Sequence, residues 1–167
     1  MRKRGSGRII NTSSVGGRVT LPFFGAYNST KYAVESLSDA MRYELTAFGI
    51  HTVLIEPGLI KTEFVGRSME LLDQYNGEDN PYRAVFERSD EMRQQMDAMS
   101  VGPEVIARAI RRAVESRRPR ARYVAPFSTY FLIGFMKCLP TRWVDAIVRM
   151  SVGLSRKRLR VKTSQKK

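Results

Sequence analysis

A strand, a long helix and a second strand follow one another between residues 8 and 56, and this succession limits the fold more than any other feature. Arg8–Ser13 is a β-branched run that ends in small polar residues, as buried strands do. Residues 26–48 carry apolar side chains at three- and four-residue steps, and Gly49 supplies a helix stop. Ile50–Glu56 is a second apolar run, which Pro57-Gly58 ends. Because strands joined by a helix pair in parallel, the sequence predicts an α/β fold.

The rest of the chain adds helices and a third strand. Residues 66–99 are rich in charged residues, Met and Gln, which predicts one or two surface helices around a loop at residues 76–81, a candidate mobile lid. Gly102-Pro103-Glu104 opens a helix that continues to Val114, and Ala121–Ala125 has the composition of a strand. Residues 156–167 are basic without hydrophobic periodicity, which is typical of disordered tails.

No internal repeat and no linker composition divides the chain. We therefore expect residues 1–155 to be part of a single domain, with a catalytic segment at residues 7–64, a lid and C-terminal region at residues 65–155, and a tail at residues 156–167. An ordinary domain of about this length can bury one core.

Charge and cysteine content restrict the function classes. The formal net charge is +13, and residues 105–167 carry 17 Lys and Arg against 2 Asp and Glu. Cys138 is the only cysteine, so the chain has no internal disulfide and no multi-cysteine metal site; a cytoplasmic location fits. The apolar stretch 123–136 is interrupted and shorter than the roughly 20 residues that span a bilayer, so we expect a buried or interfacial element, with peripheral membrane association as an open alternative.

Tyr27 and Lys31 carry the most specific chemistry in the sequence. They are four residues apart at the start of the predicted helix, so both side chains project from one face. A neighbouring ammonium favours the phenolate form of a tyrosine. The pair can therefore transfer a proton to or from an alcohol oxygen. Ser14 lies thirteen positions before Tyr27, in the loop that follows the first strand.

Three motifs in order resemble the short-chain dehydrogenase/reductase (SDR) family over residues 7–64. Asn11-Thr12-Ser13-Ser14-Val15-Gly16-Gly17 resembles N-x-S-S-x-x-G, Tyr27 to Lys31 resembles Y-x-x-x-K, and Pro57-Gly58-Leu59-Ile60-Lys61-Thr62 resembles P-G-x-[IV]-x-T. The resemblance implies an NAD(P)-dependent oxidoreductase that moves a hydride between a nicotinamide cofactor and an alcohol or carbonyl substrate.

The resemblance also implies a role for each matched residue. Ser14 orients the carbonyl or hydroxyl group, Tyr27 is the general acid and base, and Lys31 holds the nicotinamide ribose and favours the Tyr27 phenolate. The nicotinamide end of the cofactor is lined by Pro57, Gly58, the backbone near Ile60, and the Thr62 hydroxyl, together with Tyr27 and Lys31. No metal is expected.

The sequence departs from the family pattern at its start. The glycine-rich turn T-G-x-x-x-G-x-G, which binds the cofactor pyrophosphate, has no counterpart. We therefore expect a truncated, partial Rossmann-like doubly wound parallel sheet, made of the C-terminal strands and helices, with the choice between NAD and NADP open. Relatives imply a homodimer or homotetramer when the protein is complete, and no nucleic-acid partner.

Several alternatives remain open from sequence. The chain could be a catalytically inactive remnant or an interaction module, and its basic end could bind nucleic acid or an anionic membrane. Ser13 competes with Ser14 for the catalytic position, although the spacing to Tyr27 favours Ser14. His51 is expected to be structural, and Cys138 to pack as a small hydrophobe. One aromatic set either lines a lipophilic substrate pocket or fills the core: Tyr123, Phe127, Tyr130, Phe131 and Phe135.

Overall fold

The computed structural model describes residues 1–74, 77 and 80–154, which form two compact units. The first contains Met1–Ile60 and Ser100–Cys138, and the second contains Lys61–Met99 and the described part of the chain from Leu139. The predicted tail at residues 156–167 lies outside the described residues, and so do residues 76, 78 and 79 of the predicted loop at residues 76–81. The predicted domain boundaries are not tested by this division and stay a prediction.

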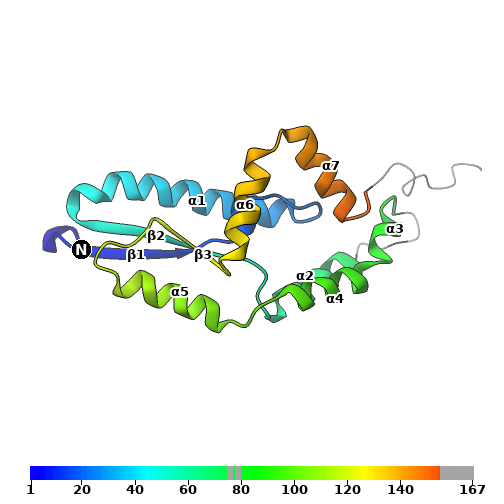
Figure 1. The fold of residues 1–167 in the computed structure, drawn as a ribbon, viewed down its shortest axis with the longest axis horizontal. Coiled ribbons are helices and arrows are strands. Elements are labelled where there is room, and N and C mark those ends of the chain that lie inside the picture. Colours follow the sequence, from blue (N-terminus) through cyan, green and yellow to red (C-terminus); the bar gives the residue numbers. More distant parts are fainter. Residues whose placement is uncertain (75–76, 78–79, 155–167) are drawn as a thin grey trace, which may run out of the picture. The chain divides into compact units, whose positions relative to one another are not determined.

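A parallel three-stranded sheet is the centre of the first unit. Its strands are β1 (Gly7–Thr12), β2 (Ile50–Pro57) and β3 (Arg122–Ala125), in the spatial order β1-β2-β3. In register, Thr12 lies beside Ile55, and Pro57 beside Ala125. Helices cover both faces, with α1 (Gly25–Leu45) on one and α5 (Glu104–Glu115) on the other (Figure 1). The predicted α/β, doubly wound class is confirmed.

Local sequence explains where α1 ends. A 3₁₀ turn, η3 (Thr46–Phe48), follows the helix, and Gly49 adopts φ 66° before β2 begins. Only glycine takes this left-handed conformation without a Cβ penalty. The helix predicted over residues 26–48 and both flanking strands are confirmed. Two further 3₁₀ turns lie in this unit, η1 (Arg2–Arg4) and η2 (Val15–Gly17).

The core lies between the sheet and α5. It contains Val53 and Ile55 of β2, Ala109 and Ala113 of α5, and Ala125 of β3. Small alanines on α5 let the helix pack closely on the sheet. The Arg8 guanidinium of β1 also donates to the carbonyls of Ala113, Val114 and Ser116 at the end of α5, which satisfies carbonyls that have no partner within the helix.

The remaining helices complete both units. In the first unit, α6 (Ser128–Cys138) follows β3. The second unit contains α2 (Glu63–Asp73), α3 (Arg83–Phe86), α4 (Ser89–Met99) and α7 (Thr141–Ser151), with α2 in contact with α4. Residues 66–99 are helical as predicted, but they contain parts of three helices rather than one or two, and α2 begins earlier, at Glu63. The role of this segment as a lid stays a prediction.

Candidate functional site

Ser14 occupies the loop that leaves the carboxyl end of β1. The Ser13 backbone N–H donates to the Ile55 carbonyl at 2.8 Å, which holds the loop at the end of β2. Ser14 then caps η2, because its Oγ accepts a hydrogen bond from the Gly16 N–H at 3.1 Å. Ser14 is buried, with 8% of its surface exposed. The strand end and the cap together fix the position of its hydroxyl group.

Gly16 lies between Ser14 and Tyr27. The point where a Cβ would stand on Gly16 is 3.5 Å from Ser14 Oγ and 3.1 Å from Cε1 of the Tyr27 ring. The same point on Gly17 is instead 2.8 Å from Ser13 Oγ and 3.0 Å from the Lys31 carbonyl oxygen. Ser14 Oγ and the Tyr27 ring therefore both approach Gly16, whereas Ser13 Oγ and the Lys31 carbonyl approach Gly17.

Tyr27 and Lys31 stand on the first turns of α1, as their spacing predicts. The Lys31 ammonium lies 5.8 Å from the centroid of the Tyr27 ring. It donates one hydrogen bond among the described residues, to the Thr12 carbonyl at 3.3 Å. An ammonium has three donors, so further donors are available for hydroxyl groups of a ligand. The three predicted side chains are thus brought to one end of the sheet.

Asn28 is a site residue that sequence reasoning missed. It is 3% exposed, and its amide donates to the carbonyls of Gly16 at 2.8 Å and Val19 at 3.5 Å while accepting from the Leu21 N–H at 3.3 Å. The side chain therefore ties the loop after η2 to the start of α1, next to Tyr27. An asparagine in the first turns of a helix that is otherwise amphipathic was the available signal.

The predicted cofactor-lining residues fall in both units. Pro57 and Gly58 end β2, where the Gly58 N–H donates to the Ala125 carbonyl at 2.8 Å. Ile60 forms an isolated parallel bridge with Val101. Thr62 belongs to the second unit, where its exposed hydroxyl accepts from the Phe64 N–H at 3.4 Å at the start of α2. The structure thus places Pro57, Gly58 and Ile60 in the unit that holds Tyr27.

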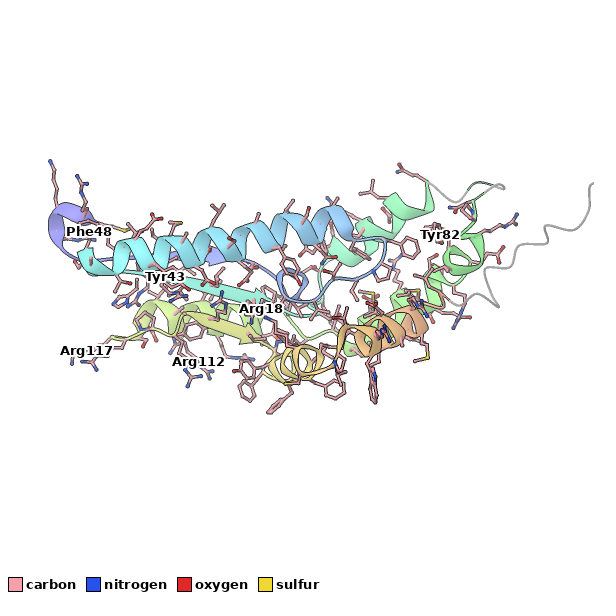
Figure 2. The ribbon with its side chains drawn as sticks, turned by 90° about the horizontal axis from the view of Figure 1, so that it is seen from above. Arg18, Tyr43, Phe48, Tyr82, Arg112 and Arg117 are labelled. Carbon is pink, nitrogen blue, oxygen red and sulfur yellow. The ribbon has the colours of Figure 1, made fainter. Side chains whose placement is uncertain are left out.

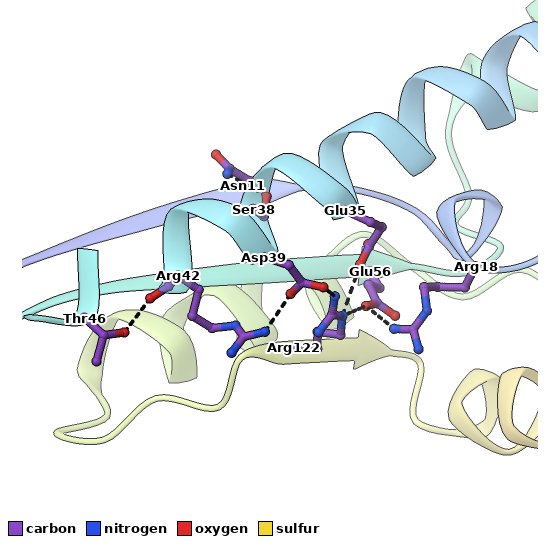
Figure 3. Close-up of polar contacts among 9 residues, drawn as sticks. All are labelled: Asn11, Arg18, Glu35, Ser38, Asp39, Arg42, Thr46, Glu56 and Arg122. Atoms are coloured by element: carbon purple, nitrogen blue, oxygen red, sulfur yellow. Dashed lines mark hydrogen bonds and ion pairs between the residues drawn. The ribbon is translucent and has the colours of Figure 1, made fainter. Parts of the chain in front are cut away.

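A partly buried ionic cluster connects α1 with β2 and β3 in the first unit (Figure 3). We call it the carboxyl cluster, and it consists of Glu35 and Asp39 of α1, Glu56 of β2, Arg18 and Arg122. Arg18 Nη1 binds Glu56 at 2.9 Å, and Arg122 binds Glu35, Asp39 and Glu56 at 3.1, 2.7 and 3.0 Å. The cluster joins α1 to Arg18 directly after η2, to the end of β2, and to β3.

Electrostatics differ between the carboxyls of this cluster. Burial raises the pKa of Glu56 above its ordinary value, and the Glu35 charge adds to the rise against the opposing charge of Arg18. Burial also acts to raise the pKa of Asp39, but hydrogen bonds from Arg122 and Arg42 outweigh it and hold that pKa below its ordinary value. A glutamate directly before Pro57 was the one sequence signal for this cluster.

Four of the predicted aromatic side chains are exposed. Phe127, Tyr130, Phe131 and Phe135 are each more than half exposed, and the Phe127 ring lies 5.9 Å from Tyr130 and 5.4 Å from Phe131. The interpretation of these four as core residues is wrong; lining of a substrate pocket stays a prediction. Tyr123, by contrast, packs against the core.

Cys138, His51 and the arginines of the basic C-terminal part were also singled out from the sequence. Cys138 is exposed, so the expectation that it packs as a small hydrophobe is wrong. His51 is exposed at the start of β2, at the end of the strand opposite Pro57. Arg112 and Arg117 project from the first unit into solvent (Figure 2).

Among the described residues, no three His, Cys, Asp or Glu side chains are grouped as metal ligands, and no helix has the length and apolarity to cross a bilayer.

Comparison with known proteins finds a family model and several curated relatives that are similar in sequence to this chain. The family model described as short chain dehydrogenase matches residues 1–71. The NADPH-dependent 3-dehydrocapnine reductase of Ornithobacterium rhinotracheale is 35% identical over 141 residues, which cover 84% of this chain and 49% of that protein. Retinol dehydrogenase 16 of Homo sapiens is 34% identical over 157 residues, which cover 87% of this chain and 49% of that protein.

A solved structure agrees with these sequence similarities. The crystal structure of a short-chain dehydrogenase from Streptomyces avermitilis superimposes with a TM-score of 0.61 at 29% identity, over 93% of this chain and 55% of that one. The chain spans about half the length of the curated relatives it matches.

Proposed function

We propose that this chain, which belongs to the short-chain dehydrogenase/reductase family, contributes the proton-transfer residues of an NAD(P)-dependent oxidoreductase that interconverts an alcohol and a carbonyl compound. One observation carries the proposal. Ser14 Oγ and the Tyr27 ring lie against the same glycine, and the Lys31 ammonium stands 5.8 Å from that ring. A hydroxyl donor, a phenol and a cation are the groups that such a proton transfer needs.

Each of the three side chains has a separate task in this proposal. The Tyr27 phenol gives its proton to the substrate oxygen during reduction and takes it back during oxidation. Ser14 Oγ donates a hydrogen bond to the same oxygen and stabilises the charge that develops on it. Lys31 stabilises the phenolate that Tyr27 becomes after it has lost the proton. Asn28 positions Tyr27 through its bonds to Gly16 in η2 and to Leu21 in the loop that follows.

The residues present fit the nicotinamide end of the cofactor. The ends of β1 and β2 lie together, and Lys31 keeps donors for ribose hydroxyls beyond its 3.3 Å bond to Thr12. We assign Tyr27, Lys31, Pro57, Gly58 and Ile60, all in the first unit, to holding this end, while the role of Thr62 stays a prediction from the sequence. The nicotinamide ring supplies or accepts the hydride when it is bound. The glycine-rich turn of the family has no counterpart in the sequence, so we assign no residue to the pyrophosphate and make no choice between NAD and NADP.

A lipophilic alcohol or ketone is the substrate class we propose. Retinol dehydrogenase 16, which is named for a lipophilic alcohol, is 34% identical to this chain. The exposed rings of Phe127, Tyr130, Phe131 and Phe135 would offer such a substrate an apolar surface.

Assembly as a homodimer or homotetramer is part of the same proposal, because α1 carries the exposed apolar side chains of Tyr32, Leu37 and Tyr43.

Serine substitutions in the natural, full-length protein test the proposal. We expect Ser14→Ala to lower kcat/KM for a lipophilic ketone about 10²- to 10³-fold, since one donor to the reacting oxygen is lost. Ser13→Ala is the matched control: its buried Oγ has no hydrogen-bond partner among the described residues, so its removal should leave turnover unchanged. Oxidation of NADH and NADPH is followed by absorbance.

Equal activity of the Ser14→Ala and Ser13→Ala variants would contradict the assigned role of Ser14. Absence of nicotinamide turnover in the wild-type protein, across lipophilic alcohols and ketones, would favour the inactive remnant instead.

A further inference from the structure

We infer that Glu35 and Glu56 share a single proton, which Glu56 carries and donates to Glu35, so that the pair holds one negative charge and keeps α1 fixed against the end of β2. The pair lies outside the residues to which the proposed proton transfer is assigned. Its protonation is therefore independent of the proposed function.

Two unsatisfied oxygens point to the shared proton. Glu35 Oε1 and Glu56 Oε2 are buried and have no hydrogen-bond partner among the described residues. The Glu56 side chain is 0% exposed and that of Glu35 is 8% exposed, so bulk water does not replace the missing donors. A carboxylate oxygen buried without a donor is destabilising. One proton between the two groups supplies a donor to one oxygen and an acceptor to the other.

One arginine nitrogen lies against both glutamates. Arg122 Nε carries one hydrogen, yet both Glu35 Oε2 and Glu56 Oε1 bind it, at 3.1 and 3.0 Å. The two carboxyl groups therefore meet at one nitrogen (Figure 3). The Arg122 Nη2 atom is engaged by Asp39 at 2.7 Å, and Arg42 also binds Asp39, at 2.8 Å. Like charges at such close approach favour protonation of one partner.

Charged groups on every neighbouring element act on the pair. The charged neighbours are Arg18 after η2, Asp39 and Arg42 on α1, Arg122 on β3, and Lys137 on α6. Burial and the Arg18 charge lower the pKa of Lys137. Among the carboxyls, Asp39 has its pKa lowered and takes no part in proton sharing. Burial together with the Glu35 charge raises the pKa of Glu56, in agreement with the geometry.

The Glu35–Glu56 pair lies close in sequence to Lys31 and to the Pro57-Gly58 turn, so its protonation affects how these residues are positioned. Glu35 is one helical turn after Lys31 on α1, and Glu56 immediately precedes Pro57. A pair with one negative charge is held by Arg122 and Arg18, whereas the two carboxylates of a doubly charged pair repel each other. Glu35 and Glu56 are therefore positioning residues for Lys31 and the Pro57-Gly58 turn, a consequence that rests on the proposed function.

Infrared spectroscopy of the chain with ¹³C-labelled glutamate tests the inference without any assay of activity. At a pH above 4.5, the ordinary glutamate pKa, we expect the C=O stretch of one protonated, buried glutamic acid. The band should be absent in Glu56→Gln. In Glu35→Gln it should disappear at a lower pH than in the wild type, because burial still raises the Glu56 pKa whereas the charge of its neighbour is gone. It should persist in Glu44→Gln, which removes an exposed carboxyl from the same helix.

The wild-type spectrum decides even where a variant fails to fold. A protonated-acid band that disappears only as the pH rises further supports the shared proton. Glutamates that are all ionised above their ordinary pKa would overturn it. So would a band that survives in Glu56→Gln, or one that disappears at the same pH in Glu35→Gln as in the wild type.

Discussion

At the scale of single residues, Glu56 combines complete burial with a position directly before the Pro57-Gly58 turn. Its carboxyl binds Arg18 and Arg122, and burial raises its pKa all the same. The folded state therefore binds the proton more tightly than the unfolded state does, and stability depends on pH through this one group.

The sign of that dependence gives a prediction for Glu56→Gln. The stabilisation from this group is fully present below the ordinary pKa of 4.5 and is lost as pH rises through the raised folded-state pKa, by about 1.4 kcal/mol for each pKa unit of elevation. A glutamine cannot ionise, so the variant should lose less stability than the wild type across this range. Urea unfolding of both chains as a function of pH, at a concentration where they sediment as monomers, measures the difference.

Glu44→Gln serves as the control, because that side chain is exposed on the same helix and should leave the wild-type pH slope intact. If Glu56→Gln kept the same slope as the wild type, Glu56 would not be the group that titrates.

At the scale of elements, the contact between η2 and the start of α1 depends on a glycine without a side chain. A Cβ on Gly16 would stand 2.7 Å from Asn28 Nδ2 and 3.1 Å from the Tyr27 ring. The Asn28 amide is itself fixed by the Gly16 and Val19 carbonyls, so it cannot move aside without losing buried hydrogen bonds.

Gly16→Ala should therefore lower the free energy of unfolding by about 1–3 kcal/mol, the usual effect of overpacking. Gly25→Ala is the matched control, because nothing lies within 4 Å of its Cβ position at the start of α1; it should be neutral or slightly stabilising. Denaturant unfolding of Gly16→Ala, Gly25→Ala and the wild type measures these differences in the free energy of unfolding. Equal stability would mean that the close approach of η2 to α1 is not fixed.

Elements were predictable where local patterns decide them. Strands β1 and β2 and helix α1 follow from apolar periodicity and from the stops at Gly49 and Pro57-Gly58. Asn28 and the carboxyl cluster could not be predicted, because burial of a polar side chain depends on partners distant in sequence: Arg122 is 87 residues from Glu35. The placement of the aromatic side chains around α6 could not be predicted for a related reason. The same run of aromatic residues is compatible with a buried core and with an exposed face.

At the scale of the whole molecule, the described chain divides into two units, and the first brings together Ser14, Tyr27 and Lys31. The matched motifs over residues 7–64 made these three side chains predictable, because they follow one strand end and one helix start. Their proximity is observed, and proton transfer by Tyr27 is the claim that connects this geometry to the proposed oxidoreductase.

Turnover of the full-length protein with Tyr27→Phe, beside Tyr32→Phe, tests that claim most directly. Tyr32 is an exposed tyrosine on the same helix, so its variant should keep wild-type kcat. Loss of the Tyr27 hydroxyl should lower kcat about 10²- to 10⁴-fold, the usual contribution of a general acid and base, while nicotinamide binding is largely retained. Wild-type kcat in Tyr27→Phe would contradict the account.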